Sequence, residues 1–564
     1  MLPVRPPQTR SLLSNDGIRL DADIYTPDRP GDFPVLLMRQ PYGRAIASTV
    51  VYAHPAWYAA HGYIVVIQDV RGRGSSEGEF RLFASEISDG EASVHWAANL
   101  PQSNGSVGMY GFSYQGMTQL YAAVNRPAPL KALCPAMLAN DLYADWAYEG
   151  DAFCLQANLG WAIQLAAETA RRLGNEAAFL RLRQAAQHLP LQDSIPANPE
   201  LLQHLAPDSF YHDWLHRPSN DSYWATLSPK TYHDRVADLP MLHIGGWFDP
   251  YLRGTLNLYQ ALADRQQAPQ HLIIGPWAHL PWGRKTGIID YGNAAVSPVD
   301  RLQIRWFDYW LKGIDNGITI EHPVQLFAMG SNTWQSLKQL PTSFTHPPTH
   351  PPSHPPTLLH LHPTGLASMS APLAAQPPTT APTPDRLVHD PWRPVPAIGG
   401  HASAPAGVFD RASLDDRSDV LTYTTEPCTE PWHLRGTPIV HLTVDSDAVS
   451  FDLCAVLSQV LPNGQVLPIA QGYRRVQPSP EQAIESPITL AIPLQATYIQ
   501  IPADAALRLS ISAACFPAYP VNPGTGTLPA AARTIDAQII TLQIHAGSVQ
   551  FDRSIVTEES PKTP

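Results

Sequence analysis

The chain has 564 residues, too many for one hydrophobic core, so about two to four domains are expected. Its net charge of -12 and the lack of a Lys/Arg block argue against a nucleic-acid partner. The five cysteines are scattered, which indicates neither a disulfide framework nor a zinc site. Because no segment resembles a signal peptide or approaches roughly 18 apolar residues, we expect a cytoplasmic protein without a membrane partner.

Residues 1–140 alternate short apolar runs with helical stretches, a pattern typical of a mostly parallel sheet covered by helices. The predicted strands are Val35–Met38, Tyr63–Gln68, Ser106–Tyr110 and Leu130–Cys134. The predicted helices are Pro55–His61, Asp89–Asn99 and Tyr114–Val124. This pattern predicts the first part of a doubly wound α/β core.

Residues 141–235 change to helices rich in Ala, Leu and Gln, including Leu159–Leu173 and Glu176–Leu189. We interpret this part as an inserted helical cap. Strand signals return in residues 236–338, at Met241–Gly245 and His271–Gly275. The sequence therefore predicts that the sheet of the first part resumes after the insertion.

The segment MYGFSYQG, residues 109–116, is typical of a turn that exposes a nucleophilic serine, Ser113. Small residues at Gly111 and Gly116 would let the chain turn sharply from strand into helix, whose N-terminus favours negative charge. The general pattern is G-x-S-x-G, but here Gln115 takes the place of the second glycine. The motif alone therefore leaves an ordinary strand-to-helix turn open.

Asp249 and His279 each follow one of the two returning strands. The order Ser113, Asp249, His279 is that of an α/β hydrolase. Active sites of open α/β sheets form outside the carboxyl ends of strands, so three distant strand ends can meet there. Taken singly, the aspartate could be a helix cap and the histidine a loop residue, but together they predict a Ser-His-Asp triad.

The segment DVRGRGSSEG, residues 69–78, places several glycines after a strand. Its spacing misses the dinucleotide-binding fingerprint by one position, and no P-loop Lys-Ser pair follows. We interpret it as a structural loop in which Arg71, Arg73 and Glu77 form ion pairs. No cofactor is predicted.

Beyond the core, residues 339–386 are predicted to form a Pro/His-rich linker with a connecting strand. The linker repeats THPPTHPPSHPP, and we expect only adventitious metal binding by His346, His350 and His354, so no metal site is predicted. Residues 387–560 show short alternating runs typical of antiparallel strands. These runs are Pro438–Val444, Phe451–Leu457, Ile488–Ile492 and Leu507–Ser512. The pattern predicts a β-sandwich of jelly-roll type.

Five motifs in this order resemble the CocE/NonD hydrolases. They are MRQPYGR (38–44), QDVRGRGSSEG (68–78), GFSYQG (111–116), GGWFD (245–249) and GPWAH (275–279). The family includes cocaine esterase and α-amino acid ester hydrolases and is similar to the X-Pro dipeptidyl-peptidases of family S15. Its elbow reads G-x-S-Y-x-G, so the displaced Gly116 fits the family. The resemblance implies an α/β-hydrolase core with a helical cap and a C-terminal jelly roll.

The resemblance also implies roles for individual residues. Ser113 would be the nucleophile, His279 its general base and Asp249 the group that orients the imidazole. The oxyanion hole would combine the backbone N–H of Tyr114 with the hydroxyl of Tyr42. Without the resemblance, Tyr42 could equally be a loop aromatic packed against the core.

Substrate choice is expected to reside in the cap and the neighbouring loops. Four aromatic residues are predicted to line an acyl pocket, although helix packing is an alternative for each: Trp146, Trp161, Trp247 and Tyr251. The carboxylates of Asp145, Glu149 and Asp151 are predicted either to bind the ammonium group of an α-amino acyl substrate or to form a solvated acidic face.

The sequence therefore predicts a serine hydrolase that cleaves carboxylic esters of small molecules through an acyl-enzyme, with amides as a further substrate class. The alternative enzyme activities are those of an X-Pro dipeptidyl-peptidase and of an α-amino acid ester hydrolase or acylase. The alternative without enzyme activity is a β-sandwich binding protein with an inactive hydrolase domain. Whether the chain forms a homo-oligomer is left open.

Overall fold

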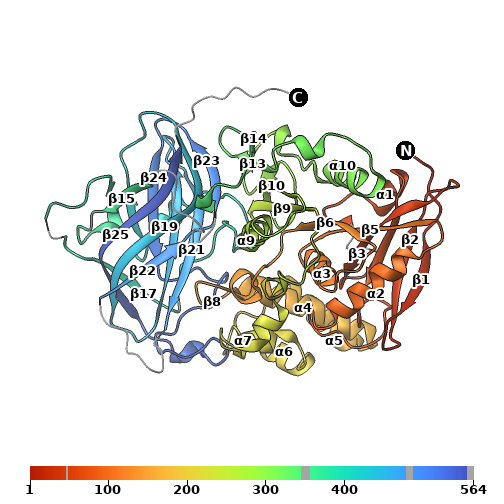
Figure 1. Cartoon of the computed structure of the whole chain (residues 1–564). Coiled ribbons are helices and arrows are strands. Elements are labelled where there is room, and N and C mark those ends of the chain that lie inside the picture. The colour runs from red at the N-terminus through yellow and green to blue at the C-terminus, as the bar shows by residue number, and fades with distance from the viewer. Residues whose placement is uncertain (46–48, 345–355, 381, 478–486, 555–564) are drawn as a thin grey trace.

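The structure is a computed structural model that describes residues 1–45, 49–344, 356–380, 382–477 and 487–554. A mixed sheet of ten strands lies in the N-terminal half, and a second sheet of eleven strands lies in the C-terminal half (Figure 1). The predicted sites of adventitious metal binding at His346, His350 and His354 lie outside the described residues. The division into domains stays a prediction.

The first sheet is parallel except at its edges. Its strands are β1 (Gln8–Leu13), β2 (Arg19–Tyr25), β3 (Phe33–Gln40), β4 (Ile64–Asp69), β5 (Ser103–Phe112), β6 (Leu130–Ala136), β9 (Met241–Phe248), β10 (Gln270–Ala278), β13 (Val324–Ala328) and β14 (Thr333–Leu337). They are ordered β1-β2-β4-β3-β5-β6-β9-β10-β13-β14, with parallel pairs from β4 to β13. The predicted strands and the resumption of the sheet after the insertion are confirmed.

Helices cover both faces of this sheet. Helices α1 (Pro55–Ala60) and α10 (Val299–Lys312) lie on one face, and α2 (Glu86–Ala98), α3 (Tyr114–Ala123) and α9 (Leu252–Ala263) lie on the other (Figure 1). Successive strand side chains point to opposite faces, so Leu36 of β3 lies in the core that includes α1 and α10, whereas Leu37 lies in the core that includes α2 and α3. Burial on both faces explains why β3 and β4 are continuous apolar runs.

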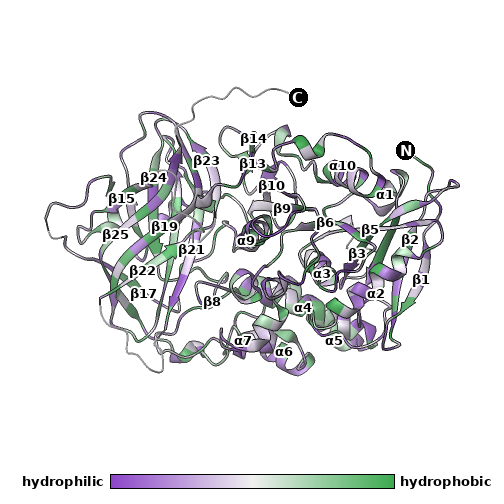
Figure 2. Cartoon of the chain, viewed as in Figure 1, coloured by the Kyte–Doolittle hydropathy of each residue, from purple (hydrophilic) through white to green (hydrophobic). Residues whose placement is uncertain are grey.

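The helical cap is inserted between β6 and β9. Its helices are α4 (Leu155–Arg172), α5 (Glu176–Gln187), α6 (Glu200–Leu205), α7 (Phe210–His216) and α8 (Ser222–Leu227). Apolar and polar residues alternate around α4 and α5, and the apolar sides are buried (Figure 2). A π-helix, η2 (Tyr143–Ala147), and the two-residue strands β7 (Tyr148–Glu149) and β8 (Ala152–Phe153) lead into the cap. These two strands are too short to leave an alternating signal in the sequence.

The second sheet folds into a β-sandwich. Its strands are β15 (Thr357–Leu361), β16 (Ala371–Ala374), β17 (Asp385–His389), β18 (Leu421–Thr424), β19 (Trp432–Ser446), β20 (Phe451–Val460), β21 (Val466–Val476), β22 (Ile488–Pro493), β23 (Thr497–Ile501), β24 (Ala506–Ser512) and β25 (Ile540–Ser554). Strands β18, β20, β21 and β24 form one leaf, the others form the second, and β16 pairs with both. Strands β15 and β16 precede residue 387, within the segment predicted as a linker with a connecting strand.

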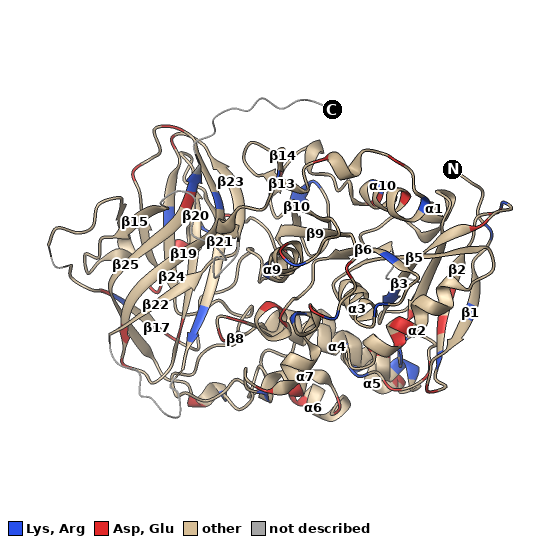
Figure 3. Ribbon diagram, in the orientation of Figure 1, with Lys and Arg blue, Asp and Glu red and all other residues tan. Residues whose placement is uncertain are grey.

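Short elements complete the described chain. They are η3 (Pro229–Tyr232), β11 (Lys285–Thr286), β12 (Ile289–Asp290), η4 (Asn293–Ala295), η5 (Ile318–Ile320), η6 (Thr342–Phe344), η7 (Ala367–Met369), α11 (Ala412–Asp415) and η8 (Thr534–Asp536). Acidic and basic residues are interspersed along both halves of the ribbon (Figure 3). Within the described ranges, every helix is too short or too polar to cross a bilayer.

Candidate active site

Ser113 stands between β5 and α3 in a backbone conformation that few residues adopt. Its φ is 59° and its ψ is −124°, a kind of conformation that costs about 1–3 kcal/mol and persists where the surroundings enforce it. Gly111 has a φ of 141°, and a Cβ there would lie 2.4 Å from the Cβ of Gln115. A Cβ on Gly116 would lie 2.9 Å from the carbonyl oxygen of Ala136 in β6. The displaced glycine is therefore needed for α3 to pack on β6.

Asp249 and His279 follow two neighbouring parallel strands, β9 and β10, and their side chains meet. Nδ1 of His279 lies 2.8 Å from Oδ1 of Asp249, whose side chain is fully buried. The rings of His279 and Phe112, the residue before Ser113, are 5.3 Å apart between centroids. Because parallel strands end at the same sheet edge, β5, β9 and β10 bring Ser113, Asp249 and His279 to one place.

Tyr42 follows β3, and its hydroxyl lies beside Ser113. It is hydrogen-bonded to the Ser113 side chain and accepts a hydrogen bond of 3.2 Å from the indole N–H of Trp161 in the cap. Burial raises the pKa of Tyr42 to about 12, although Trp161, the charge of Arg73 and the contact with Ser113 lower it. The hydroxyl therefore stays protonated at neutral pH and can donate to an oxyanion.

The phenol of Tyr114 points away from Ser113 into the core. Its hydroxyl donates to Glu86 at 2.8 Å, and its ring stacks on Phe83 with centroids 4.5 Å apart. The backbone N–H of Tyr114 is at the first position of α3, where an N–H has no acceptor within the helix. The predicted contribution of Tyr114 to the oxyanion hole therefore rests on its backbone.

Aromatic side chains of the cap and of the connection between β9 and α9 contact these groups. The Tyr251 ring meets the His279 ring edge-on, with centroids 5.0 Å apart. The Trp146 ring lies 4.3 Å from Tyr251 and 5.1 Å from Trp161. Contacts therefore run in a closed circuit through Ser113, Tyr42, Trp161, Trp146, Tyr251, His279 and Phe112. We call these seven residues the site circuit.

Trp247 is not part of the site circuit. Its indole N–H donates to the carbonyl oxygen of Phe327 at 2.7 Å, and its ring stacks on Phe344. It belongs to the core shared by the first sheet and the sandwich. The structure therefore assigns Trp247 to packing, which corrects its predicted place in an acyl pocket.

The three carboxylates predicted as an ammonium site or an acidic face each have a partner within the protein. The ion pairs are Asp145 with Arg253 at 3.2 Å, Glu149 with His401 at 2.8 Å and Asp151 with Arg474 at 3.0 Å. Asp145 and Glu149 are buried, so they do not form a solvated face. Glu149 and Asp151 line a cavity of about 340 Å³ between the cap and the sandwich. In the described part of the chain, no cluster of His, Cys, Asp and Glu could hold a metal ion.

In the glycine-rich loop after β4, two of the three residues that were predicted to form ion pairs do form them. The ion pairs join Arg71 to Asp16 and Asp89, and Glu77 to Arg19. For Arg73 the prediction is wrong, because its Nε donates to the carbonyl oxygen of Pro41 at 2.9 Å. A fully buried Arg73 therefore contacts the segment that carries Tyr42.

Comparison with known proteins identifies the family. Residues 16–281 match the family model "X-Pro dipeptidyl-peptidase (S15 family)", and residues 316–549 match "X-Pro dipeptidyl-peptidase C-terminal non-catalytic domain". Cocaine esterase of Rhodococcus sp. (strain MB1 Bresler) is 30% identical over 563 residues, covering 94% of this chain and 95% of that protein. The chain belongs to the CocE/NonD hydrolase family.

Solved structures share the CocE/NonD fold over nearly the whole chain. An aminopeptidase from the marine sediment archaeon Thaumarchaeota archaeon has a TM-score of 0.79 at 22% identity, covering 97% of this chain and 96% of that one. An α-amino acid ester hydrolase has a TM-score of 0.77 at 23% identity, covering 98% and 97%. The predicted α/β-hydrolase core with a cap and a C-terminal β domain is therefore confirmed.

Membership of the CocE/NonD family makes this protein an enzyme of the serine hydrolase type. The alternative of a binding protein with an inactive hydrolase domain is accordingly not retained.

Two contacts near the candidate site were not predicted from the sequence. Gln495 donates to the carbonyl oxygen of Asp249 at 2.7 Å from 246 residues away, and no motif marks it. Arg73 lies inside the motif QDVRGRGSSEG (68–78), but the sequence does not show whether its partner is a carboxylate or a backbone carbonyl.

Proposed function

We propose that this protein hydrolyses carboxylic esters of small molecules through an acyl-enzyme on Ser113. The observation that carries the proposal is the site circuit together with Asp249, because it groups a strained serine, a protonated tyrosine and a histidine paired with a buried aspartate. Such a constellation joins nucleophile, base, orienting carboxylate and oxyanion donor.

In the first half-reaction, Ser113 Oγ attacks the ester carbonyl carbon while Nε2 of His279 takes the hydroxyl proton. Asp249 accepts the Nδ1–H of His279 and so holds the imidazole in the tautomer that can act as a base. The carbonyl oxygen becomes negative and accepts hydrogen bonds from Tyr42 Oη and the backbone N–H of Tyr114. Collapse breaks the bond to the alcohol oxygen, which leaves with the proton from His279.

In the second half-reaction, water takes the place of the alcohol. His279 removes a proton from water as it attacks the acyl carbon, and the same oxyanion donors bind the second tetrahedral intermediate. Collapse returns the proton to Ser113 and releases the acid. The buried rings of Trp146 and Tyr251 and the partly buried ring of Trp161 make an apolar acyl group a better match than a charged one.

Release of X-Pro dipeptides is a second candidate, supported by the descriptions of the two matching family models. A dipeptidyl-peptidase must bind the N-terminal ammonium group of its substrate near the serine. An α-amino acid ester hydrolase must likewise bind the α-ammonium group of its substrate. The nearby carboxylates of Asp145 and Glu149 are already engaged by Arg253 and His401. This engagement favours simple esters over both alternatives and over amides of amino acids.

Rapid mixing with p-nitrophenyl acetate tests the proposal. A burst of p-nitrophenol equal to the enzyme concentration is expected, because acylation by this activated ester should be faster than hydrolysis of the acyl-enzyme by water. Ser113→Ala should abolish the burst and turnover without changing the melting temperature, whereas Ser106→Ala, in the preceding strand β5, should keep both the burst and turnover. Asp249→Asn should lower kcat by about 10,000-fold, since the imidazole loses its productive tautomer. Turnover that survives Ser113→Ala would overturn the proposal.

A further inference from the structure

Arg73 is a buried cation whose hydrogen-bond partners are all uncharged. Its Nη1 donates to the carbonyl oxygen of Leu165 at 3.1 Å and to Oγ1 of Thr169 at 2.9 Å, in addition to the Nε contact with Pro41. Its guanidinium also lies over the ring of Phe80, 4.7 Å from the centroid. Among the described residues, no carboxylate forms an ion pair with Arg73.

A buried charge without a charged partner destabilises a folded protein. Burial lowers the pKa of Arg73 to about 10, so the guanidinium nevertheless remains charged at neutral pH. Proteins contain such unpaired buried charges mainly at functional sites. We therefore expect Arg73 to have a function in the candidate site.

The hydrogen-bond partners of Arg73 belong to two parts of the chain: helix α4, and residues 40–44, which we call the Tyr42 segment. Pro41 immediately precedes Tyr42, so the Nε contact fixes the backbone next to the proposed oxyanion tyrosine. Leu165 lies one turn after Trp161 on α4, and Trp161 donates to the Tyr42 hydroxyl. One guanidinium thus joins the Tyr42 segment to the helix that supplies its hydrogen-bond donor.

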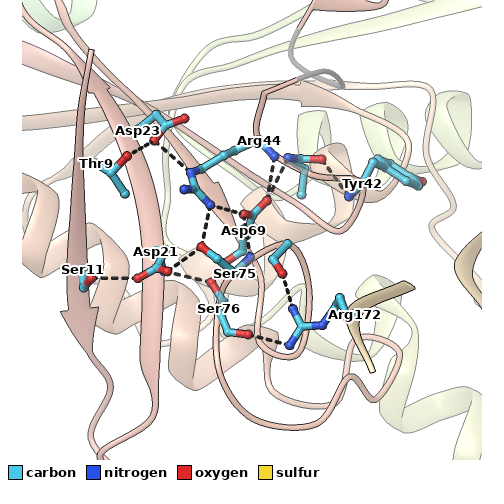
Figure 4. A network of polar contacts seen from close by, with 12 residues as sticks. Thr9, Ser11, Asp21, Asp23, Tyr42, Arg44, Asp69, Ser75, Ser76 and Arg172 are labelled. Atoms are coloured by element: carbon cyan, nitrogen blue, oxygen red, sulfur yellow. Dashed lines mark hydrogen bonds and ion pairs between the residues drawn. The ribbon is translucent and has the colours of Figure 1, made fainter. Parts of the chain in front are cut away.

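The other side of the Tyr42 segment is held by Asp69 at the end of β4 (Figure 4). Asp69 accepts hydrogen bonds from the backbone N–H of Arg44 at 2.7 Å, from its Nη1 at 2.6 Å and from the side-chain amide of Gln40 at 3.3 Å. The Gln40 oxygen in turn accepts from the Tyr42 N–H at 2.8 Å. Both flanks of Tyr42 are therefore anchored to the loop of residues 69–78.

The same loop is attached to the cap by a second arginine, Arg172 of α4. Its guanidinium donates to the carbonyl oxygens of Gly74 at 2.7 Å and Ser76 at 2.9 Å (Figure 4). Arg172 thus bridges the loop and the cap as Arg73 does, but its bonds do not reach the Tyr42 segment. It provides a matched control.

We propose that Arg73 is a positioning residue for catalysis, which holds the Tyr42 hydroxyl against Ser113 by joining Pro41 to helix α4. The inference rests on the proposed function, in which Tyr42 stabilises the oxyanion. The positive charge of Arg73 lowers the pKa of Tyr42, so it also favours negative charge that develops at an oxygen bound by this hydroxyl. Its removal should therefore lower kcat more than it changes KM.

A double-mutant cycle tests this role. Arg73→Met should lower kcat for p-nitrophenyl acetate by about 10- to 100-fold, because displacing a catalytic group by 1 Å can cost about 100-fold. Tyr42→Phe should lower kcat by about 100-fold or more. In the Tyr42→Phe background, Arg73→Met should cost less than about threefold further, because coupled residues are not additive.

Controls separate positioning from stability. Arg172→Met should lower the melting temperature while leaving kcat within about twofold, since its bonds do not reach Pro41. Equal losses from Arg73→Met in both backgrounds, or an equal loss of kcat from Arg172→Met, would overturn the positioning role. An unchanged kcat in Tyr42→Phe would instead overturn the oxyanion role in the proposed function.

Two milder variants test the same positioning role if Arg73→Met does not fold. Arg73→Lys keeps the charge but cannot reach both segments with a planar fork, so it should recover only part of kcat. Thr169→Val removes one acceptor of Arg73 and should lower kcat several-fold in wild type but not in the Tyr42→Phe background. Additive effects of Thr169→Val would again overturn the inference.

Discussion

The side-chain amide of Gln495 donates a hydrogen bond of 2.7 Å to the carbonyl oxygen of Asp249. Gln495 belongs to the sandwich, where its own N–H donates to the carbonyl oxygen of Gln471 at 2.7 Å. Both ends of this connection are buried. The sandwich therefore helps to fix the backbone of the residue that orients His279.

Gln495→Leu should weaken both catalysis and stability. An unpaired buried carbonyl costs about 1–3 kcal/mol, and a shifted Asp249 would orient His279 less well. We expect kcat for p-nitrophenyl acetate to fall several-fold and the free energy of unfolding in urea to fall by about 1–3 kcal/mol. Gln500→Leu, in β23 of the same domain, should leave kcat unchanged. Equal kcat in both variants would show that the sandwich does not tune the site.

Trp161→Phe should isolate the hydrogen bond to Tyr42. The ring is kept but the indole N–H is lost, and a hydrogen bond contributes about 0.5–1.5 kcal/mol, so kcat should fall by about two- to tenfold. Trp224→Phe removes another indole N–H of the cap, which donates to the carbonyl oxygen of Pro218, and should leave kcat unchanged. Steady-state kinetics on p-nitrophenyl acetate compare the two. If both lose kcat alike, cap stability rather than the contact with Tyr42 is responsible.

Asp145→Asn should harm esters with and without an α-amino group to the same extent. The carboxylate already accepts hydrogen bonds from the backbone N–H groups of Asn140 and Asp141, at 3.1 and 2.7 Å, and contacts Arg253. Its loss should therefore lower stability rather than remove an ammonium site. The measurement compares kcat/KM for phenylglycine methyl ester and methyl benzoate. A loss confined to phenylglycine methyl ester would support the amino acid ester hydrolase alternative.

Glu149 should contribute a stability that depends on pH. Burial alone would raise the pKa of Glu149, but the charge and hydrogen bond of His401, with Arg253 and Tyr519, outweigh it and lower the pKa to about 2. Because the folded pKa lies below the unfolded value of 4.5, this stabilisation is present above pH 4.5 and is lost as the pH falls towards 2. It amounts to about 3 kcal/mol at about 1.36 kcal/mol per pKa unit.

Urea unfolding at a series of pH values checks this prediction. The difference in unfolding free energy between wild type and Glu149→Gln should be largest above pH 4.5 and should shrink steadily towards pH 2. Asp151→Asn is the control, because the Asp151 side chain is 49% exposed and an exposed ion pair contributes little. A difference that does not change with pH would contradict the depressed pKa of Glu149.

Much of the core and the candidate site could be predicted from local patterns. Buried parallel strands such as β3 and β4 leave continuous apolar runs, and Ser113 sits in an elbow whose glycines are sterically required. The contact between Asp249 and His279 could be expected because each of them follows a strand of the same sheet. The strands β15 and β16 were assigned less well, because each has at most five residues and lies in a proline-rich context.

The sequence by itself determined the central strands of the first sheet, the order of Ser113, Asp249 and His279 and the family, because strand periodicity and motif spacing are properties of neighbours along the chain. Tertiary structure alone decided which side chains meet. It separated Trp146 and Trp161, which contact Tyr251 and Tyr42, from Trp247, which packs in a core. It also gave Arg73 and Gln495 their partners, because a hydrogen bond depends on position in space and carries no signal in spacing.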